Sequence, residues 1–240
     1  RPSNLSMEEQ QANMAWQQIR LVEYLNELPV IQFRFDEIEA DDIIAYLTQT
    51  QQFEGWEKVI VSNDKDFIQL CDDETVLYRP TQKVVHNKMN VVETFDIHPR
   101  NFAVARAIAG DPSDNLEGVP RAGLKSIAKN LNFLREDKDV TLKDIFRFCE
   151  NVDSKAKFFS NVLEYQDIVI SNYKLMQLYA PAISLQSKEK VNYALDNFEY
   201  DYNKTEILRM MNQDGFGVFN WEDLHGTMNK ICTDKALRKG

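Results

Sequence analysis

Apolar and polar positions alternate with two different periods near the start of the chain. Apolar side chains recur every three residues, as at Trp16, Ile19 and Val22. This spacing predicts an amphipathic helix over residues 6–28. Residues 30–35 (VIQFRF) then alternate between apolar and polar side chains, which indicates a strand.

Helix and strand signals continue to alternate up to about residue 86. A helix is predicted over 41–51, and the apolar run 59–61, bounded by polar residues, is typical of a buried parallel strand. A short helix is expected through residues 67–70. Residues 75–79 and 83–86 flank a proline-containing turn, which predicts a β-hairpin.

Helical periodicity dominates the rest of the chain. Pro99 is expected to open a helix over 101–109, because proline suits the first helical position. From about residue 122 to the end, the pattern is helical throughout. Strands alternating with helices, followed by a helical run, predict an α/β sheet with a helical subdomain behind it.

Composition narrows the class of protein. With 240 residues and 43% hydrophobic residues, the chain can bury a sizeable core, which excludes an intrinsically disordered protein. No run approaches the ~20 apolar residues of a membrane span. Cys71, Cys149 and Cys232 are odd in number and widely spaced, which argues against a disulfide framework and favours a reducing compartment. The net charge of −10 argues against a protein that coats nucleic acid through bulk charge.

Carboxylates cluster at predicted element boundaries. Two clusters follow predicted strands, on the edge where open α/β sheets build ligand sites, and the third follows the helix 101–109. Converging carboxylates repel one another unless cations neutralise them, and all-oxygen ligation favours Mg²⁺ or Mn²⁺ over zinc. The seven candidate ligands are Glu39, Asp41, Asp42, Asp64, Asp66, Asp111 and Asp114.

Each cluster also has a structural interpretation. Asp41 and Asp42 suit the first turn of a helix, where they favour its dipole by roughly 0.3–1 kcal/mol each. Asp64 and Asp66 suit a turn that caps the next helix, and GDPSDN (110–115) suits an Asx/Pro turn. An EF-hand is excluded, because no Asp-x-Asp-x-Asp-Gly run with a closing Glu is present. Three clusters at element boundaries together favour a metal site.

The segment GVPRAGLKS (118–126) suggests contacts with phosphate. Gly118 and Gly123 flank a turn that leads into a predicted helix, where glycine allows close approach of the backbone. Lys125 and Arg121 add positive charge nearby. The alternative is a purely structural corner between helices, and the spacing of the Lys-Ser pair excludes a P-loop.

The order and spacing of EADD (39–42), NDKDFIQL (63–70) and GDPSDN-x-x-GVP-x-x-G-x-K (110–125) resemble the 5′-nuclease (flap endonuclease) superfamily. The resemblance covers about residues 30–131 and extends to the 5′-nuclease domain of bacterial DNA polymerase I and to phage-type exonucleases such as phage ribonuclease H. It implies an α/β fold with a PIN/5′-nuclease-like, mostly parallel sheet flanked by helices. A helical subdomain would contain a helix-3-turn-helix module.

The resemblance also implies roles for individual residues. All seven carboxylates would act as catalytic metal ligands for two Mg²⁺ sites, with Mn²⁺ able to substitute. A K⁺ ion is the further cofactor that the family places at the helix-3-turn-helix. The residues expected to contact DNA are Gly118, Val119, Arg121, Gly123, Lys125 and Ser126.

The implied function is a structure-specific 5′ nuclease, a 5′-3′ exonuclease and flap endonuclease of replication and repair. Its expected substrates are DNA with a 5′ flap or free 5′ end, or an RNA–DNA hybrid. The expected protein is a monomer without membrane contact, in the cytoplasm or, for a phage protein, the host cytoplasm, with replication proteins as further partners. The alternatives are a catalytically incomplete DNA-junction binding module and a PIN-type ribonuclease or metal-dependent phosphatase.

The resemblance predicts four regions. Residues 1–28 would form a limb of a helical arch, 29–98 the metal-site core, 99–131 the helix-3-turn-helix module and 132–240 a C-terminal helical region. The family begins with an aspartate-bearing strand and a second aspartate, for which this sequence has no counterpart. We therefore expect an N-terminal segment of the family to be missing and the ligand set to be incomplete.

Overall fold

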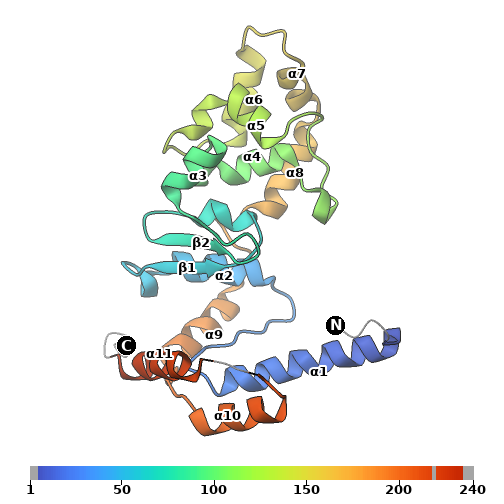
Figure 1. The fold of residues 1–240 in the computed structure, drawn as a ribbon. Helices are drawn as coiled ribbons and strands as arrows, with labels where there is room; N and C mark the ends of the chain where they lie inside the picture. Colours follow the sequence, from blue (N-terminus) through green and yellow to red (C-terminus); the bar gives the residue numbers. More distant parts are fainter. Residues whose placement is uncertain (1–4, 218–219, 235–240) are drawn as a thin grey trace. The chain divides into compact units, whose positions relative to one another are not determined.

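A computed structural model describes residues 5–217 and 220–234, so the first four residues of the predicted limb 1–28 lie outside the described residues. The chain divides into two compact units (Figure 1). One unit combines residues 1–36 with 184–240, and the other comprises residues 37–183. Among the described residues, every helix is too short or too polar to span a lipid bilayer.

The described residues of the first unit form four helices, and the first of these confirms the prediction for 6–28. Ser6 caps that helix, because its side chain accepts from the Glu9 backbone while the Glu9 carboxylate accepts from the Ser6 backbone. A small core forms around Ile207, Met210 and Met211. The helices are α1 (Met7–Asn26), α9 (Leu185–Asp196), α10 (Lys204–Gln213) and α11 (Trp221–Thr233).

The apolar stripe of α1 is not buried, contrary to the amphipathic interpretation. Trp16, Ile19 and Val22 are 53%, 63% and 49% exposed. The contacts of α1 with α10 and the residues that follow it come instead from another side of the helix. There, Arg20 and Tyr24 both bind the carboxylate of Asp214. Sequence periodicity therefore predicted the helix correctly but not the face that packs.

The second unit contains a three-stranded sheet in the order β1 (Lys58–Val61), β2 (Thr75–Arg79), β3 (Val84–His86). β1 and β2 are parallel, and β2 and β3 form the predicted antiparallel hairpin. The predicted parallel strand over 59–61 therefore forms. The prediction that it is buried is wrong, because only Ile60 is buried while Val59 and Val61 are 55% and 65% exposed.

The predicted strand over 30–35 is also wrong. This segment has no strand structure, and of its apolar residues Val30 is exposed while the others are half-buried. Its side chains alternate as expected, with Ile31, Phe33 and Phe35 more buried than their neighbours. Alternation alone does not make a strand, because a strand needs a neighbour that pairs with its backbone groups.

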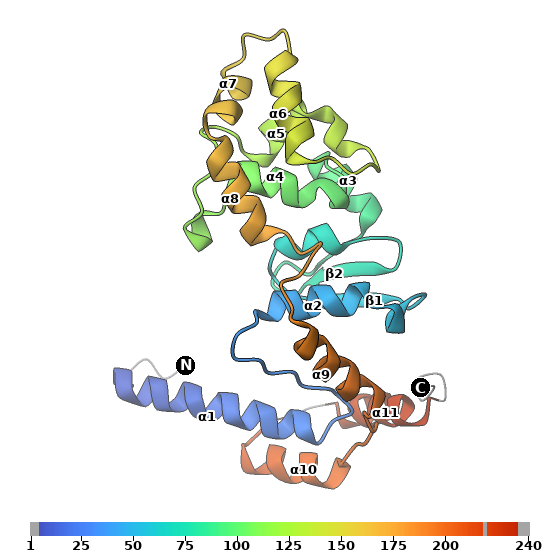
Figure 2. The same ribbon diagram turned by 180° about the vertical axis from the view of Figure 1, so that it is seen from behind.

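Within the second unit, the helices α3 to α8 lie together to one side of the sheet (Figure 2). The residues of α4 are almost all buried, and α4 packs against both α5 and α8, so it is the centre of the helical part. The helical pattern predicted from residue 122 onward is confirmed for the described residues up to 234, and residues 218–219 and 235–240 lie outside them. The helix over Lys88–Phe95 was not predicted. The α-helices of this unit are α2 (Ala40–Gln49), α3 (Lys88–Phe95), α4 (Phe102–Ala109), α5 (Leu124–Asn130), α6 (Leu142–Asn151), α7 (Lys157–Glu164) and α8 (Gln166–Met176).

Short 3₁₀ helices form several of the connections between the α-helices and strands. Two of them carry acidic residues of the predicted metal-ligand set. η2 (Asp66–Leu70) follows β1 and confirms the predicted short helix through 67–70. η4 (Pro112–Asp114) lies directly after α4. The remaining ones are η1 (Gln51–Phe53), η3 (Pro99–Asn101) and η5 (Asn132–Arg135).

Candidate metal centre and nucleic-acid interface

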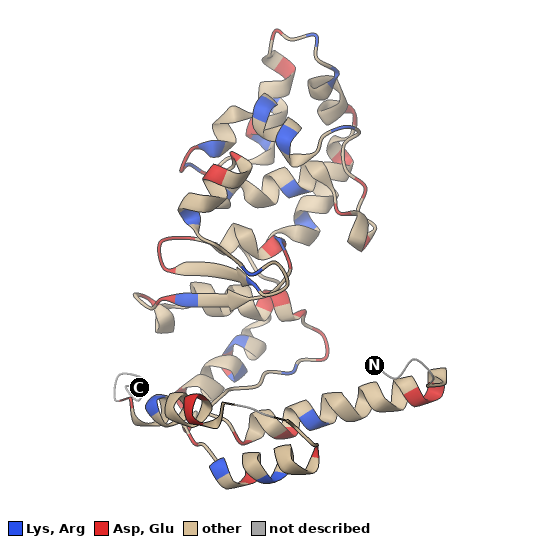
Figure 3. Ribbon diagram, viewed as in Figure 1, with Lys and Arg blue, Asp and Glu red and all other residues tan. Residues whose placement is uncertain are grey.

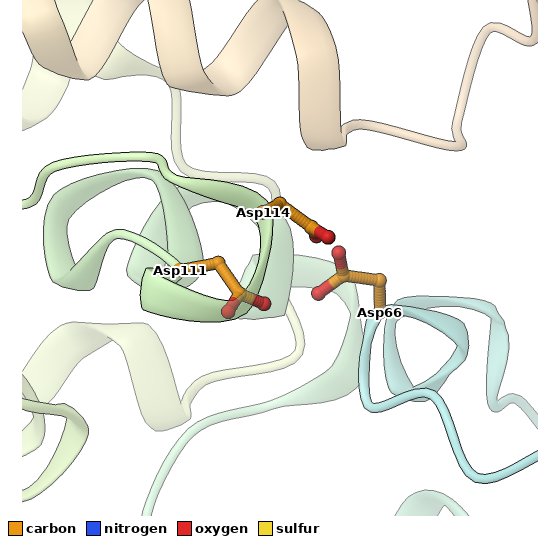
Figure 4. A group of neighbouring side chains, drawn as sticks. All are labelled: Asp66, Asp111 and Asp114. Carbon is orange, nitrogen blue, oxygen red and sulfur yellow. The ribbon is translucent and has the colours of Figure 1, made fainter.

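Three carboxylates from two separate segments converge in the second unit. Asp66, Asp111 and Asp114 each present an oxygen, and these atoms lie within 4.8 Å of one another. Asp66 begins η2, while Asp111 precedes η4 and Asp114 ends it. Figure 4 shows the side chains of Asp66 and Asp114 pointing toward each other, with the Asp111 carboxylate beside them. Three carboxylate groups form a donor set that suits a hard divalent cation such as Mg²⁺ or Mn²⁺.

The loop that carries Asp111 and Asp114 closes on itself. The backbone of Asp111 donates to Leu116 and accepts from it, both at 2.8 Å. The Asp111 side chain accepts from the backbone and the hydroxyl of Ser113, which caps η4. The Asx/Pro turn interpretation of 110–115 is therefore correct for the local structure, and the same turn presents two acids to the group.

Glycines allow this loop to fold back against the end of α4. A Cβ at Gly118 would lie 2.0 Å from the Ala109 carbonyl oxygen, and one at Gly110 would lie 2.4 Å from the Gly118 nitrogen. Gly110 also has a φ of +73°, in the region that favours glycine. The side-chain amide of Asn172 donates to the carbonyls of Ala107 and Glu117, which fastens α8 to both ends of this loop.

Arg106 joins the acids from the two segments. Its Nε donates to Asp66 Oδ1 at 2.8 Å, and its Nη2 donates to Asp111 Oδ2. The side chains of Arg106, Asp66 and Asp111 are only 11%, 14% and 14% exposed. Sequence reasoning missed Arg106, although one arginine within the apolar helix FAVARAIA is the usual sign of a paired, partly buried charge.

The electrostatic environment shifts the pKa values of these acids in different directions. Burial raises the pKa of Asp41 to about 6, and the negative charges of Asp64 and Glu39 add to the effect. Burial also raises the pKa of Asp66, although the Arg106 hydrogen bond opposes the shift. For Asp111 the hydrogen bonds from Ser113 and Arg106 outweigh burial and lower the pKa. Partly buried acids whose charges repel one another create a site that a cation stabilises.

The other predicted ligands lie around this group without joining it. The charges of Asp64 and Asp66 act on Asp41, so the three carboxylates lie near one another. Asp64 Oδ1 accepts from the Asp66 backbone at 2.8 Å, as a turn-forming aspartate does. Asp42 Oδ1 accepts from the Ala182 backbone at 3.0 Å, and Glu39 stands at the N-cap of α2. The structure thus brings three of the seven together.

The predicted phosphate-binding segment divides into inner and outer residues. Val119 is 3% exposed, its backbone donates to the Ile108 carbonyl, and Ser126 is half-buried. Arg121 and Lys125 are exposed, and a Cβ at Gly123 would meet nothing within 4 Å. Figure 3 shows basic residues on α5 and α6 and acidic residues at the start of α2. The outer residues are therefore exposed to a ligand, whereas Gly118 and Val119 pack against the end of α4.

Comparison with known sequences shows which proteins the chain is similar to. The profile of the N-terminal resolvase-like domain of 5′-3′ exonucleases matches residues 7–96. A 5′-3′ exonuclease of Buchnera aphidicola is 34% identical over 137 residues, and the Aquifex aeolicus 5′-3′ exonuclease is 31% identical over 143 residues. These alignments cover 57% and 59% of this chain, and the chain spans 45% of the length of both relatives. DNA polymerase I of Mycobacterium tuberculosis is 43% identical over 96 residues, which are 38% of this chain and 10% of that protein.

Structural comparison agrees with the sequence. The bacteriophage T5 5′-exonuclease with bound divalent metal ions (zinc) has a TM-score of 0.57 at 18% identity, over 88% of this chain and 71% of that one. A bacteriophage T5 flap endonuclease variant in a complex with DNA and metal ions has a TM-score of 0.59 at 19% identity, over 88% and 74%. The fold is therefore the resolvase-like α/β fold of these nucleases, as predicted. In its motifs, its sequence relatives and its fold, the chain is similar to proteins of the 5′-nuclease superfamily.

Proposed function

We propose that this chain is part of a divalent-metal-dependent, structure-specific 5′ nuclease that hydrolyses phosphodiester bonds at 5′ ends, flaps or junctions of DNA. The observation that carries the proposal is the convergence of Asp66, Asp111 and Asp114 within 4.8 Å. The exonuclease relatives and the metal-containing T5 structures support it. Hydrolysis of a phosphodiester needs concentrated positive charge beside the phosphate, and these acids are placed to hold it.

Asp66, Asp111 and Asp114 would hold one Mg²⁺, and Mn²⁺ would substitute. Asp41 and Asp64, with Glu39 and Asp42, would complete a second position. Bound divalent ions lower the pKa of a water and stabilise the charge of the leaving oxygen. The chain's own residues orient the site: Ser113 and Arg106 hold Asp111 in place, and Arg106 also holds Asp66.

We assign the grip on duplex DNA to the exposed side of the turn before α5. Arg121 and Lys125 are exposed there, and the open space at Gly123 lets a phosphate approach the backbone. Contacts to phosphates orient a duplex without selecting its sequence. Selectivity would then come from the shape of the substrate.

The test is cleavage of a 5′-labelled flap duplex with Mg²⁺, with Mn²⁺ and with EDTA. We expect release of the flap with either cation and none in EDTA. Asp114→Asn should slow cleavage at least about tenfold, because it removes a carboxylate from the group. Asp153→Asn is the matched control, since Asp153 is an exposed aspartate in the loop before α7. It should cleave at the wild-type rate.

Three outcomes would contradict the proposal. Full cleavage in EDTA would exclude a metal mechanism. Tight binding of the flap duplex with no cleavage under any metal condition would favour a catalytically incomplete DNA-junction binding module. Cleavage of single-stranded RNA without a preference for duplex ends would favour a PIN-type ribonuclease.

The remaining expectations belong to this proposal. They are action on RNA–DNA hybrids, a K⁺ ion at the turn before α5, a monomeric state, a cytoplasmic location and replication proteins as partners. The flap assay extends to the first two by exchange of the labelled strand for RNA and of K⁺ for Na⁺ in the buffer. Binding that depends on K⁺ but not Na⁺ would support the potassium position.

A further inference from the structure

Arg106 uses all three nitrogen positions of its guanidinium within the candidate metal centre. Nε donates to Asp66 Oδ1 at 2.8 Å, Nη2 donates to Asp111 Oδ2, and Nη1 donates to the Gly110 carbonyl at 3.3 Å. The side chain is 11% exposed and leaves α4, the most buried helix of its unit. A guanidinium held at three points and packed on a rigid helix has one orientation.

The two aspartates that Arg106 binds come from distant parts of the sequence. Asp66 follows β1, whereas Asp111 follows α4, and each side chain is 14% exposed. Two such carboxylates placed side by side repel each other. The planar fork of an arginine matches carboxylate geometry and fixes both distance and orientation, which a lysine ammonium does not do.

We infer that Arg106 is a positioning residue that sets the spacing of Asp66 and Asp111 for a divalent cation. The inference rests on the proposed function and goes beyond it, because it assigns the preorganisation of the acids to one residue that is not itself a ligand. Arg106 touches the carboxylates and acts through them. Hydrogen-bond partners behind metal ligands typically change metal affinity by about 10–100-fold when they are replaced.

A role of Arg106 that depends on its positive charge alone predicts the opposite change in cation affinity. The choice of variants distinguishes this role from positioning. If Arg106 only supplied positive charge, its loss would strengthen cation binding, because the site would become more negative. Arg106→Lys keeps the charge and removes the fork, whereas Arg106→Gln removes both. Positioning predicts that both variants bind a cation more weakly. Charge alone predicts wild-type affinity for Arg106→Lys and tighter binding for Arg106→Gln.

The experiment is calorimetric titration of the whole chain with Mn²⁺ alone, so that the readout does not depend on cleavage. We expect at least about tenfold weaker binding for both variants than for the wild type. Arg135→Lys is the matched control, because Arg135 pairs with Asp96 but is 59% exposed. Thermal melts in EDTA and in saturating Mn²⁺ report whether each variant folds, and saturating Mn²⁺ should restore part of the melting temperature that Arg106→Lys loses.

The outcomes separate this inference from the proposed function. Wild-type Mn²⁺ affinity in Arg106→Lys, or tighter binding in either variant, would overturn the positioning role even if the protein cleaves flaps. Weaker binding in both variants, with no cleavage by the wild type, would support the role of Arg106 and count against the nuclease. If the wild type binds no Mn²⁺, the inference is overturned, because Arg106 would then not position the two aspartates for a cation.

Discussion

Gly118 passes so close to Ala109 that a Cβ on Gly118 would lie 2.0 Å from the Ala109 carbonyl oxygen. The neighbouring Val119 backbone donates to the Ile108 carbonyl at 2.8 Å, which fixes the crossing. This contact returns the chain to the end of α4 after the loop that carries Asp111 and Asp114. The glycine therefore serves the geometry of the acids, although its place in the sequence suggested contact with phosphate.

Gly118→Ala should destabilise the protein strongly. The added methyl group meets backbone atoms that cannot move aside, so we expect a loss of about 3 kcal/mol in the free energy of unfolding. Gly123→Ala is the control, because nothing lies within 4 Å of a Cβ at Gly123, and it should cost about 1 kcal/mol or less as an N-cap change. Urea unfolding measures both, and equal losses would show that the close approach is not real.

Lys125→Ala should weaken binding to duplex DNA by a similar factor for every sequence. A lysine that contacts one phosphate contributes about one released counterion, so the slope of log K against log salt should fall by about 1. The measurement is fluorescence anisotropy with two unrelated duplexes at several salt concentrations. Lys174→Ala, which removes an exposed lysine from α8, should leave the slope unchanged. A loss confined to one duplex sequence would contradict the phosphate role.

Asp214 should make the stability of the first unit sensitive to acid. Arg20 and Tyr24 hydrogen-bond its carboxylate at 2.7 and 2.6 Å, and these bonds lower the pKa of Asp214 from its usual value. A lowered pKa stabilises the fold above the unfolded value, and this contribution is lost as the pH falls through the folded value. Asp214→Asn should therefore melt below the wild type at pH 7, and the difference should shrink toward pH 3. A difference independent of pH would show that the carboxylate charge is not involved.

Much of the secondary structure could be predicted from local sequence patterns. The predictions that were wrong have a common cause. The helix 6–28, the hairpin 75–86 and the helical run after residue 122 all form, because caps, turns and periodicity act over a few residues. The strand 30–35 does not form, and β1 is only half covered. Both errors concern what lies beside a segment, and a single sequence does not encode that in its local period.

The candidate site shows the same division. The sequence located Asp66, Asp111 and Asp114 by their place at element boundaries, and the structure brings them together. It did not distinguish them from Glu39 and Asp42, because the same boundary position suits an N-cap or a turn. Arg106 was missed because its partners lie 40 and 5 residues away and become neighbours only when α4 packs beside η2.

The exposed valines of β1 have a practical consequence. Val59 and Val61 present apolar surface on a strand that pairs with β2 and stands at the end of the sheet order. Edge strands with flat apolar faces associate with other chains, so this surface promotes aggregation of the purified chain. Val59→Lys would reduce aggregation at high protein concentration, because a charge on an edge strand opposes pairing with a strand of another chain.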